Sequence, residues 1–271
     1  VNILSLHGTH SILQVRNIDY LTFGAHKLNH FSALKLNGDF DSVIKLLQGQ
    51  VTSDCSKLGI GLGQPSALCD EKGYILCNFD LLLHLESVVA IIDREQQDIF
   101  IDEINKFAPF FKVSLTPLNI QLTGRIRKPK EKILPNEHII LTTDHALASL
   151  MLDLDISEKS ETQEDEWSIN RKLLGDHLIE KKDHCKYRPH ELMQDLSRVS
   201  FTKGCFRGQE IIARMEYLGK RKKQTELIVH SSLKEIDQFE VIGHSFKLNK
   251  KYFSSCLGKK DLFSQMGLSP N

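Results

Sequence analysis

The side chains of this chain that could do chemistry gather in one stretch, Phe201 to Glu210, which reads Phe-Thr-Lys-Gly-Cys-Phe-Arg-Gly-Gln-Glu without hydrophobic periodicity. Cys205 is the candidate nucleophile, because a thiol between Lys203 and Arg207 and just before a helix is in a positive field that favours the thiolate. The backbone N–H groups at the start of that helix could also hold a carboxylate or a phosphate. The alternative is a buried, inert cysteine in a tight turn with a basic rim.

The elements on either side must position this loop. Gly204 and Gly208 bracket it, which predicts a positive φ or a close approach of the backbone to a ligand at these positions. After Gly208 the apolar residues recur at helical spacing, and Gln209 and Glu210 suit the first turn of a helix. The pattern therefore predicts a strand that ends near Phe201, a glycine-flanked loop and a short helix.

The stretch continues with Ala213-Arg214 and Tyr217-Leu218-Gly219, and in this form it resembles the signature of the YgfZ family. These folate-binding proteins are related to the glycine-cleavage T-protein, an aminomethyltransferase. They are associated with iron–sulfur cluster assembly or repair and with tRNA modification that depends on iron–sulfur enzymes. A second stretch, Gln48 to Asp54, matches the family pattern Gln-Gly-Gln-x-Thr-x-Asp. Taken alone, it would be a helix end at Gly49 followed by a polar loop.

The resemblance implies a pocket for tetrahydrofolate or another reduced folate, lined by Trp167, the only tryptophan, and by Phe31. The other interpretation of a single tryptophan is core packing. The resemblance also implies that Cys205 is the catalytic, reactive or cluster-proximal group and that Lys203 tunes it. The further residues assigned to the folate site lie in or just after the signature: Gly204, Gly208, Gln209, Glu210 and Arg214.

One departure from the T-protein pattern concerns catalysis. T-proteins carry an acidic residue just after a Gly-Gly-Ile stretch, whereas Gly73-Tyr74-Ile75-Leu76 is followed here by Cys77 and Asn78. A neutral thiol and an amide cannot supply the negative charge that stabilises an iminium-like species. Aminomethyl transfer is therefore not supported, and the primary expectation is a folate-binding role in iron–sulfur cluster assembly or repair. A folate-dependent one-carbon (aminomethyl) transferase or demethylase is the first alternative. A non-catalytic binding scaffold is the second alternative.

Charge and composition narrow the class of partner. The 35 Lys and Arg residues balance 35 Asp and Glu residues, and the pI is about 7.3, so direct nucleic-acid binding is not expected. No apolar run reaches membrane-spanning length and no signal peptide is recognised, which predicts a cytoplasmic protein without a membrane partner. The expected partners are folate and iron–sulfur client enzymes such as tRNA-modifying enzymes. The six cysteines form no CxxC pair, and His184, Cys185 and His190 lack ligand spacing, so no metal site is predicted.

The order strand, strand, helix, strand predicts an α+β fold with an antiparallel sheet. The resemblance makes this a T-protein-like folate-binding fold, with antiparallel sheets around a central cavity. Residues 1–224 would form it from two intertwined subdomains, 1–152 and 167–224, joined by an acidic linker at 153–166. Residues 225–271 would be a short, apparently truncated, barrel-like β segment, because about forty residues cannot close a barrel of several strands.

The local patterns predict individual elements as well. Phe31 to Leu36 alternates as a strand does, and Asp41 is the expected cap of the helix that follows. The apolar residues 81–92 are expected to continue one strand, because many of them are β-branched. The basic residues between 116 and 137 predict a solvated loop, and residues 146–152 a short helix.

Overall fold

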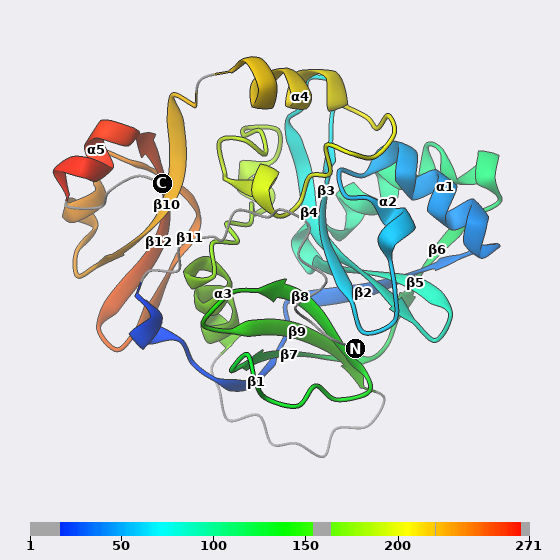
Figure 1. The fold of residues 1–271 in the computed structure, drawn as a ribbon, viewed down its shortest axis with the longest axis horizontal. Coiled ribbons are helices and arrows are strands. Elements are labelled where there is room, and N and C mark those ends of the chain that lie inside the picture. Colours follow the sequence, from blue (N-terminus) through cyan, green and yellow to red (C-terminus); the bar gives the residue numbers. More distant parts are fainter. Residues whose placement is uncertain (1–16, 154–163, 220, 267–271) are drawn as a thin grey trace.

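The computed structural model describes residues 17–153, 164–219 and 221–266 (Figure 1). Within them the strands form three sheets, in which every neighbouring pair is antiparallel. The expected α+β class with antiparallel sheets is confirmed. The predicted acidic linker lies largely outside the described residues. No helix among the described residues is long and apolar enough to span a bilayer.

The largest sheet has five strands in the order β3-β4-β5-β2-β6. The strands are β2 (Phe31–Asn37), β3 (Gly63–Cys69), β4 (Ile75–His84), β5 (Ser87–Asp93) and β6 (Ser114–Leu118). The helices α1 (Phe40–Gln50) and α2 (Gln97–Asn105) bury their apolar residues against one face of this sheet. The other face is turned to the rest of the molecule (Figure 1).

Two local predictions for this sheet were wrong. Residues 81–92 form a hairpin rather than one strand, since Leu85 and Glu86 both adopt positive φ between the paired residues His84 and Ser87. This geometry suits a two-residue hairpin turn, but the pair lacks the Asn or Gly that would have marked it in the sequence. The cap of α1 is Asp39, not Asp41, because the Asp39 carboxylate accepts a hydrogen bond from the Ser42 N–H at 3.2 Å.

The second sheet has the order β1-β7-β9-β8, and two of its strands replace predicted elements of another kind. Its strands are β1 (Gly24–Lys27), β7 (Gln121–Arg127), β8 (Glu137–Thr142) and β9 (Leu147–Asp153). β7 lies within the predicted basic loop, where alternate residues from Leu122 to Ile126 are buried. β9 replaces the predicted helix, because pairing with β7 and β8 on both sides outweighs the helix propensity of its Ala and Leu residues.

The C-terminal strands form a third sheet with the order β10-β12-β11. It comprises β10 (Lys223–His230), β11 (Glu240–Leu248) and β12 (Lys251–Lys259), and is followed by α5 (Lys260–Gln265). The sheet is open rather than a closed barrel, as the expected short β segment requires. α3 (Glu164–Leu173) contacts β1 and β7 on one side and β11 and β12 on the other, so it joins the second and third sheets (Figure 1).

The signature stretch leads into α4 (Gln209–Leu218), as predicted. The expected strand before it is absent, because residues 197–208 have an irregular backbone. Hydrogen bonds to other loops replace those of a sheet in this stretch, for example the bond from the Lys203 ammonium to Val51 O.

Candidate functional site

A cavity of about 480 Å³ lies where the five-stranded sheet, α3 and β11 meet. This volume is in the range of sites for small organic ligands, about 300–1,000 Å³. Strands β2 and β4 contribute Phe31 and Asn78 to its wall, and β11 contributes Phe246. Two of the three sheets therefore contribute to the wall of this cavity together with α3, and one of them is the C-terminal sheet.

Trp167 and Phe31, the two aromatic residues expected at a folate pocket, both line this cavity. The Trp167 indole has no exposed surface, and it packs on Gly124 so closely that a Cβ at that position would lie 2.5 Å from Cε3. Gly124 thus makes room for the indole. The Trp167 Nε1–H is also buried, and it has no hydrogen-bond acceptor among the described residues.

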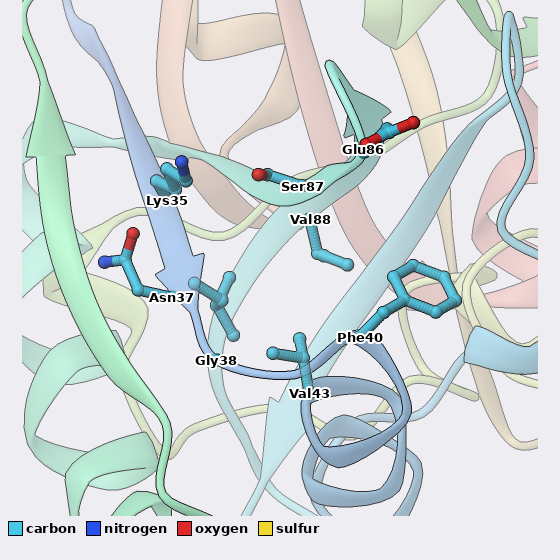
Figure 2. A pocket seen from close by; sticks show the side chains of 9 residues that line it. Lys35, Asn37, Gly38, Phe40, Val43, Glu86, Ser87 and Val88 are labelled. Atoms are coloured by element: carbon cyan, nitrogen blue, oxygen red, sulfur yellow. The ribbon is translucent and has the colours of Figure 1, made fainter.

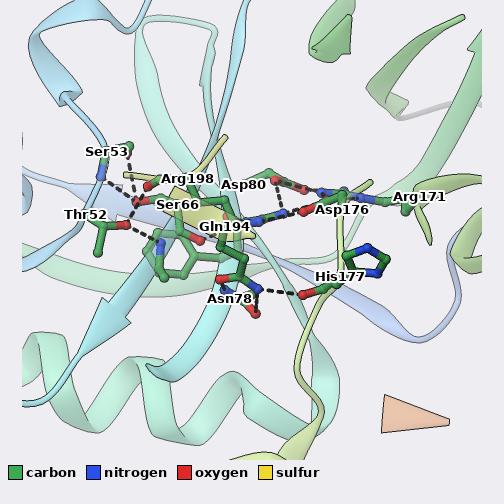
Figure 3. Close-up of polar contacts among 12 residues, drawn as sticks. Thr52, Ser53, Ser66, Asn78, Asp80, Arg171, Asp176, His177, Gln194 and Arg198 are labelled. Carbon is green, nitrogen blue, oxygen red and sulfur yellow. Dashed lines mark hydrogen bonds and ion pairs between the residues drawn. The ribbon is translucent and has the colours of Figure 1, made fainter. Parts of the chain in front are cut away.

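Two arginines and two aspartates form a buried ion network beside the cavity (Figure 3). Arg171 donates to Asp80 at 2.6 Å and to Asp176 at 2.7 Å, and Arg198 donates to Asp176 at 2.8 and 2.9 Å. Arg198 also binds the backbone carbonyls of Ser66 and Phe79. Burial alone would raise the pKa of the Asp176 carboxyl, but the two guanidinium groups hold it well below its usual range. The network ties α3 to the five-stranded sheet.

Asn78 forms an amide pair with Gln194 (Figure 3), and it is one of the two residues that follow the stretch resembling the T-protein Gly-Gly-Ile motif. Its Nδ2 donates to Gln194 Oε1 at 2.9 Å, and its Oδ1 accepts from Gln194 Nε2 and from Ile179 N, both at 3.0 Å. Burial raises the pKa of the neighbouring Cys77 thiol well above its usual value, so this residue is neutral as well. Neither residue provides a negative charge here.

The signature stretch and the Gln48–Asp54 stretch, far apart in the chain, bind each other directly. The Arg207 N–H donates to Gly49 O at 3.1 Å, and the Ser200 N–H donates to Thr52 O at 2.9 Å. Thr52 Oγ1 donates to the Arg198 carbonyl at 2.7 Å. The two stretches that carry the resemblance therefore form one structural unit.

Comparison with known proteins gives the following relatives. An uncharacterized protein from Haemophilus influenzae is 30% identical over 182 residues, which cover 66% of this chain and 64% of that protein. The tRNA-modifying protein YgfZ from Yersinia pseudotuberculosis is 28% identical over 66% of this chain and 63% of its own length. YgfZ from Escherichia coli strain K12 is 25% identical over 69% of this chain and 67% of its own length. The chain thus spans about two thirds of the length of the curated relatives it matches, and no family model matches it.

The resemblance to the YgfZ family is confirmed. The fold agrees, since the crystal structure of the glycine cleavage system aminomethyltransferase T from Bartonella henselae superposes with a TM-score of 0.58. That match covers 90% of this chain and 81% of the other at 14% sequence identity, so it shows the T-protein fold alone.

Lys203, expected to tune the thiol of the YgfZ-type signature, makes its contacts elsewhere. Its ammonium is buried and donates to Val51 O at 2.8 Å and to Ser53 O at 2.7 Å. Burial lowers the pKa of Lys203 to about 8. Arg207, on the other side of Cys205, pairs with Glu71 at 2.8 Å and Glu103 at 2.6 Å. Both cations have partners within the protein, and the Cys205 thiol is exposed.

The remaining signature residues lie away from the aromatic cavity. Gly208 has φ +81°, and a Cβ there would lie 2.5 Å from Asp70 O, so this position requires glycine. Gly204 has no positive φ, and a Cβ there would meet no protein atom within 4 Å, so its expected close approach to a ligand stays a prediction. Three further residues of the expected folate site do not line the cavity; they lie on α4, half-buried or exposed: Gln209, Glu210 and Arg214.

Sequence reasoning missed several polar residues beside the cavity. Asp80, Asp176 and Arg198 were not singled out, although charged residues inside apolar stretches, such as Asp80 in β4, are a signal for a buried ion network. His190 belongs to a group with Asp195 and Glu216, whose ligand atoms lie within 4.8 Å of one another, rather than with His184 and Cys185. Arg221 is already bound to Asp195 and His190 in that group.

A second, smaller cavity of about 140 Å³ opens where β2 ends and α1 begins (Figure 2). Lys35, Phe40 and Glu86 are among the residues that line it. None of the residues expected at a folate site lies there, so the larger cavity is the candidate site.

Proposed function

We propose that this protein binds tetrahydrofolate or a related reduced folate in the larger cavity and acts in iron–sulfur cluster assembly or repair, in support of enzymes that include tRNA-modifying ones. The observation that supports the proposal most directly is the position of Trp167 and Phe31 on the wall of one cavity of about 480 Å³. The relatives named tRNA-modifying protein YgfZ support the cellular role.

The residues of the cavity suit a folate in three respects. Aromatic walls from Phe31, Trp167 and Phe246 can cover flat rings, which gain free energy from apolar burial and from offset stacking. Close packing on Gly124 holds the Trp167 indole in place, so this part of the wall is preformed for a ligand. Polar groups such as Arg94 and Glu95 also line the cavity. A bound reduced folate would supply a carrier for one-carbon units.

Cys205 has a separate part in the proposal. Its thiol is exposed on the signature loop and is not among the cavity residues, which supports a role toward a protein partner or an iron–sulfur substrate rather than toward the folate. We expect Cys205→Ser to fail in restoring iron–sulfur enzyme activity to a strain that lacks this protein. Full restoration would reduce Cys205 to a structural residue and favour a non-catalytic scaffold.

Aminomethyl transfer is not proposed, because the two residues that follow the Gly-Gly-Ile-like stretch are the neutral Cys77 and Asn78, whose side-chain amide is bound to Gln194 and Ile179. A test for turnover of methylated amines in the presence of tetrahydrofolate would expose such an activity.

The first experiment is a titration with tetrahydrofolate, followed by the fluorescence of Trp167 and by calorimetry. We expect saturable quenching, and a roughly tenfold loss of affinity in Phe246→Ala, which removes an aromatic wall and keeps the fluorophore. Phe40→Ala, at the smaller cavity, is the matched control and should bind as the wild type does. Absence of saturable binding to the wild-type protein would reject the folate proposal.

A further inference from the structure

The wall of the larger cavity contains a buried lysine whose ammonium has one hydrogen-bond acceptor among the described residues. Lys172 lines the cavity and is only 6% exposed. Its ammonium donates to Ser255 Oγ at 2.8 Å and lies over the Phe246 ring, 5.4 Å from the centroid, but among the described residues it forms no ion pair. An ammonium group has three N–H donors, and leaving them unpaired in a buried site costs free energy.

Ser255, the hydrogen-bond partner of Lys172, also binds a second buried residue. Ser255 Oγ accepts from Lys172 and lies 2.9 Å from Nδ1 of His177, which is also buried. Burial, followed by the nearby Lys172 charge, lowers the pKa of His177 to about 3, so the neutral ring can accept the Ser255 proton. The row Lys172–Ser255–His177 therefore orients the ammonium without neutralising it.

The neighbouring charged groups of the described chain do not form an ion pair with the Lys172 ammonium. Arg171 lines the same cavity but is bound to Asp80 and Asp176. Glu180 and Asp183 are the nearest sources of negative charge, and their carboxylates accept hydrogen bonds from the His244 and Gly243 backbone. Lys172 is thus a cation in the cavity wall without a bound carboxylate among the described residues.

We infer that Lys172 forms a subsite for an acceptor oxygen of the ligand at the floor of this cavity, with Ser255 and His177 holding the ammonium in place. The inference rests on the proposed function, because it concerns the same cavity. A folate offers such oxygens at two ends, as the carbonyl of its pterin and as the carboxylates of its glutamate. The subsite determines which end lies between α3 and β12.

The protonation of Lys172 adds a pH dependence to this subsite. Burial lowers the pKa of Lys172 to about 8. The groups that face it are Glu180 and Asp183, which favour the ammonium, Lys182, which opposes it, Cys256 on β12, and the neutral His177. The ammonium loses its proton as the pH rises through about 8, so the affinity for an anionic oxygen should fall over the same range.

The test compares the wild type, Lys172→Met and the control Lys45→Met, an exposed residue of α1, by calorimetry with tetrahydrofolate, tetrahydropterin and p-aminobenzoylglutamate. Lys172→Met cannot form the charged hydrogen bond to the ligand. We therefore expect it to bind tetrahydrofolate, and one of the two fragments, roughly 10- to 100-fold more weakly than the wild type does. The sensitive fragment identifies the end that meets Lys172. The affinity of the wild type, but not of Lys172→Met, should fall between pH 7 and 9 if that end is the carboxylate.

Two results overturn the inference: Lys172→Met binds tetrahydrofolate and both fragments as tightly as the wild type does, or the wild type binds neither fragment nor tetrahydrofolate. If the wild type binds one fragment in a Lys172-dependent way but not tetrahydrofolate, the subsite stands and the folate proposal fails. Should Lys172→Met not fold, Lys172→Gln takes its place, with about a tenfold loss expected because the amide keeps a donor without the charge.

Discussion

At the scale of single residues, the two glycines of the signature differ in what the backbone demands of them. Gly208 precedes α4 in a left-handed conformation, with φ +81°, and touches the chain at Asp70 O. A side chain there would be strained by its φ and would collide with a backbone oxygen that cannot move away. Gly204 is free of both constraints.

We predict that Gly208→Ala lowers the free energy of unfolding by at least about 2 kcal/mol, from the left-handed strain and the overlap together. Gly204→Ala should change it by less than about 0.5 kcal/mol. Urea denaturation of both variants, followed by circular dichroism, makes the comparison. Equal losses in the two variants would contradict this account of Gly208.

At the scale of elements, Lys203 joins two loops that have no sheet to hold them together. Its ammonium reaches Val51 O and Ser53 O across 152 and 150 positions of sequence, respectively, and it lies over the Phe206 ring. Burial disfavours the charged form, which is why its pKa falls to about 8. The residue therefore contributes to the shape of the signature loop through the backbone of the other motif.

A pH dependence of stability follows from this burial. Lys203 loses its proton near pH 8 in the folded protein, but only near its ordinary value of 10.5 in the unfolded chain. The unfolded chain therefore binds more protons in between, and the contribution of Lys203 to stability increases with pH in this window.

We predict that the free energy of unfolding of the wild type, relative to that of Lys203→Met, increases by about 2 kcal/mol between pH 8 and pH 10. Urea denaturation at several pH values measures it. The Lys203 charge lowers the pKa of Cys55, but burial raises that pKa to about 12, so Cys55 stays neutral up to pH 10 in the folded state of both proteins. A difference that is flat with pH would show that Lys203 titrates normally.

At the scale of the whole molecule, the C-terminal sheet completes the cavity through a joint with the loop that follows α3. Asp183 accepts a hydrogen bond from Gly243 N at 2.9 Å, and Glu180 accepts one from His244 N at 2.7 Å. Gly243 has φ +63°, and a Cβ there would lie 2.8 Å from Glu180 Oε1, so the β11 backbone lies directly on this loop. His244 and Phe246 then line the cavity.

We predict that Asp183→Ala loosens this joint, lowers the free energy of unfolding by about 1–3 kcal/mol and makes Trp167 more accessible to acrylamide. The control is Glu235→Ala, which removes a hydrogen-bonded cap within the C-terminal segment but away from the joint. Quenching that rises equally in both variants would mean that the joint does not govern access to the cavity.

The outcome at particular residues shows where sequence reasoning succeeds. The glycine and the helix start at 208–209 were predicted correctly, because a turn and a first helical turn depend on neighbouring residues. Residues 146–152 were wrongly expected to be helical, because the state of this segment depends on the pairing of β9 with β7 and β8. Asp39 rather than Asp41 caps α1, because local sequence patterns do not fix the first residue of a helix to within one or two positions.

By itself, the sequence determined the α+β class and the resemblance to the YgfZ family, because both depend on residue types in a fixed order. It also singled out Trp167 and Phe31. Only the tertiary structure decided that Lys203 binds the Val51 and Ser53 carbonyls, and that Lys172 meets Ser255 at the cavity floor. The physical reason is that a buried charge is governed by the partners that folding brings to it from distant segments, and the order of residues does not specify those partners.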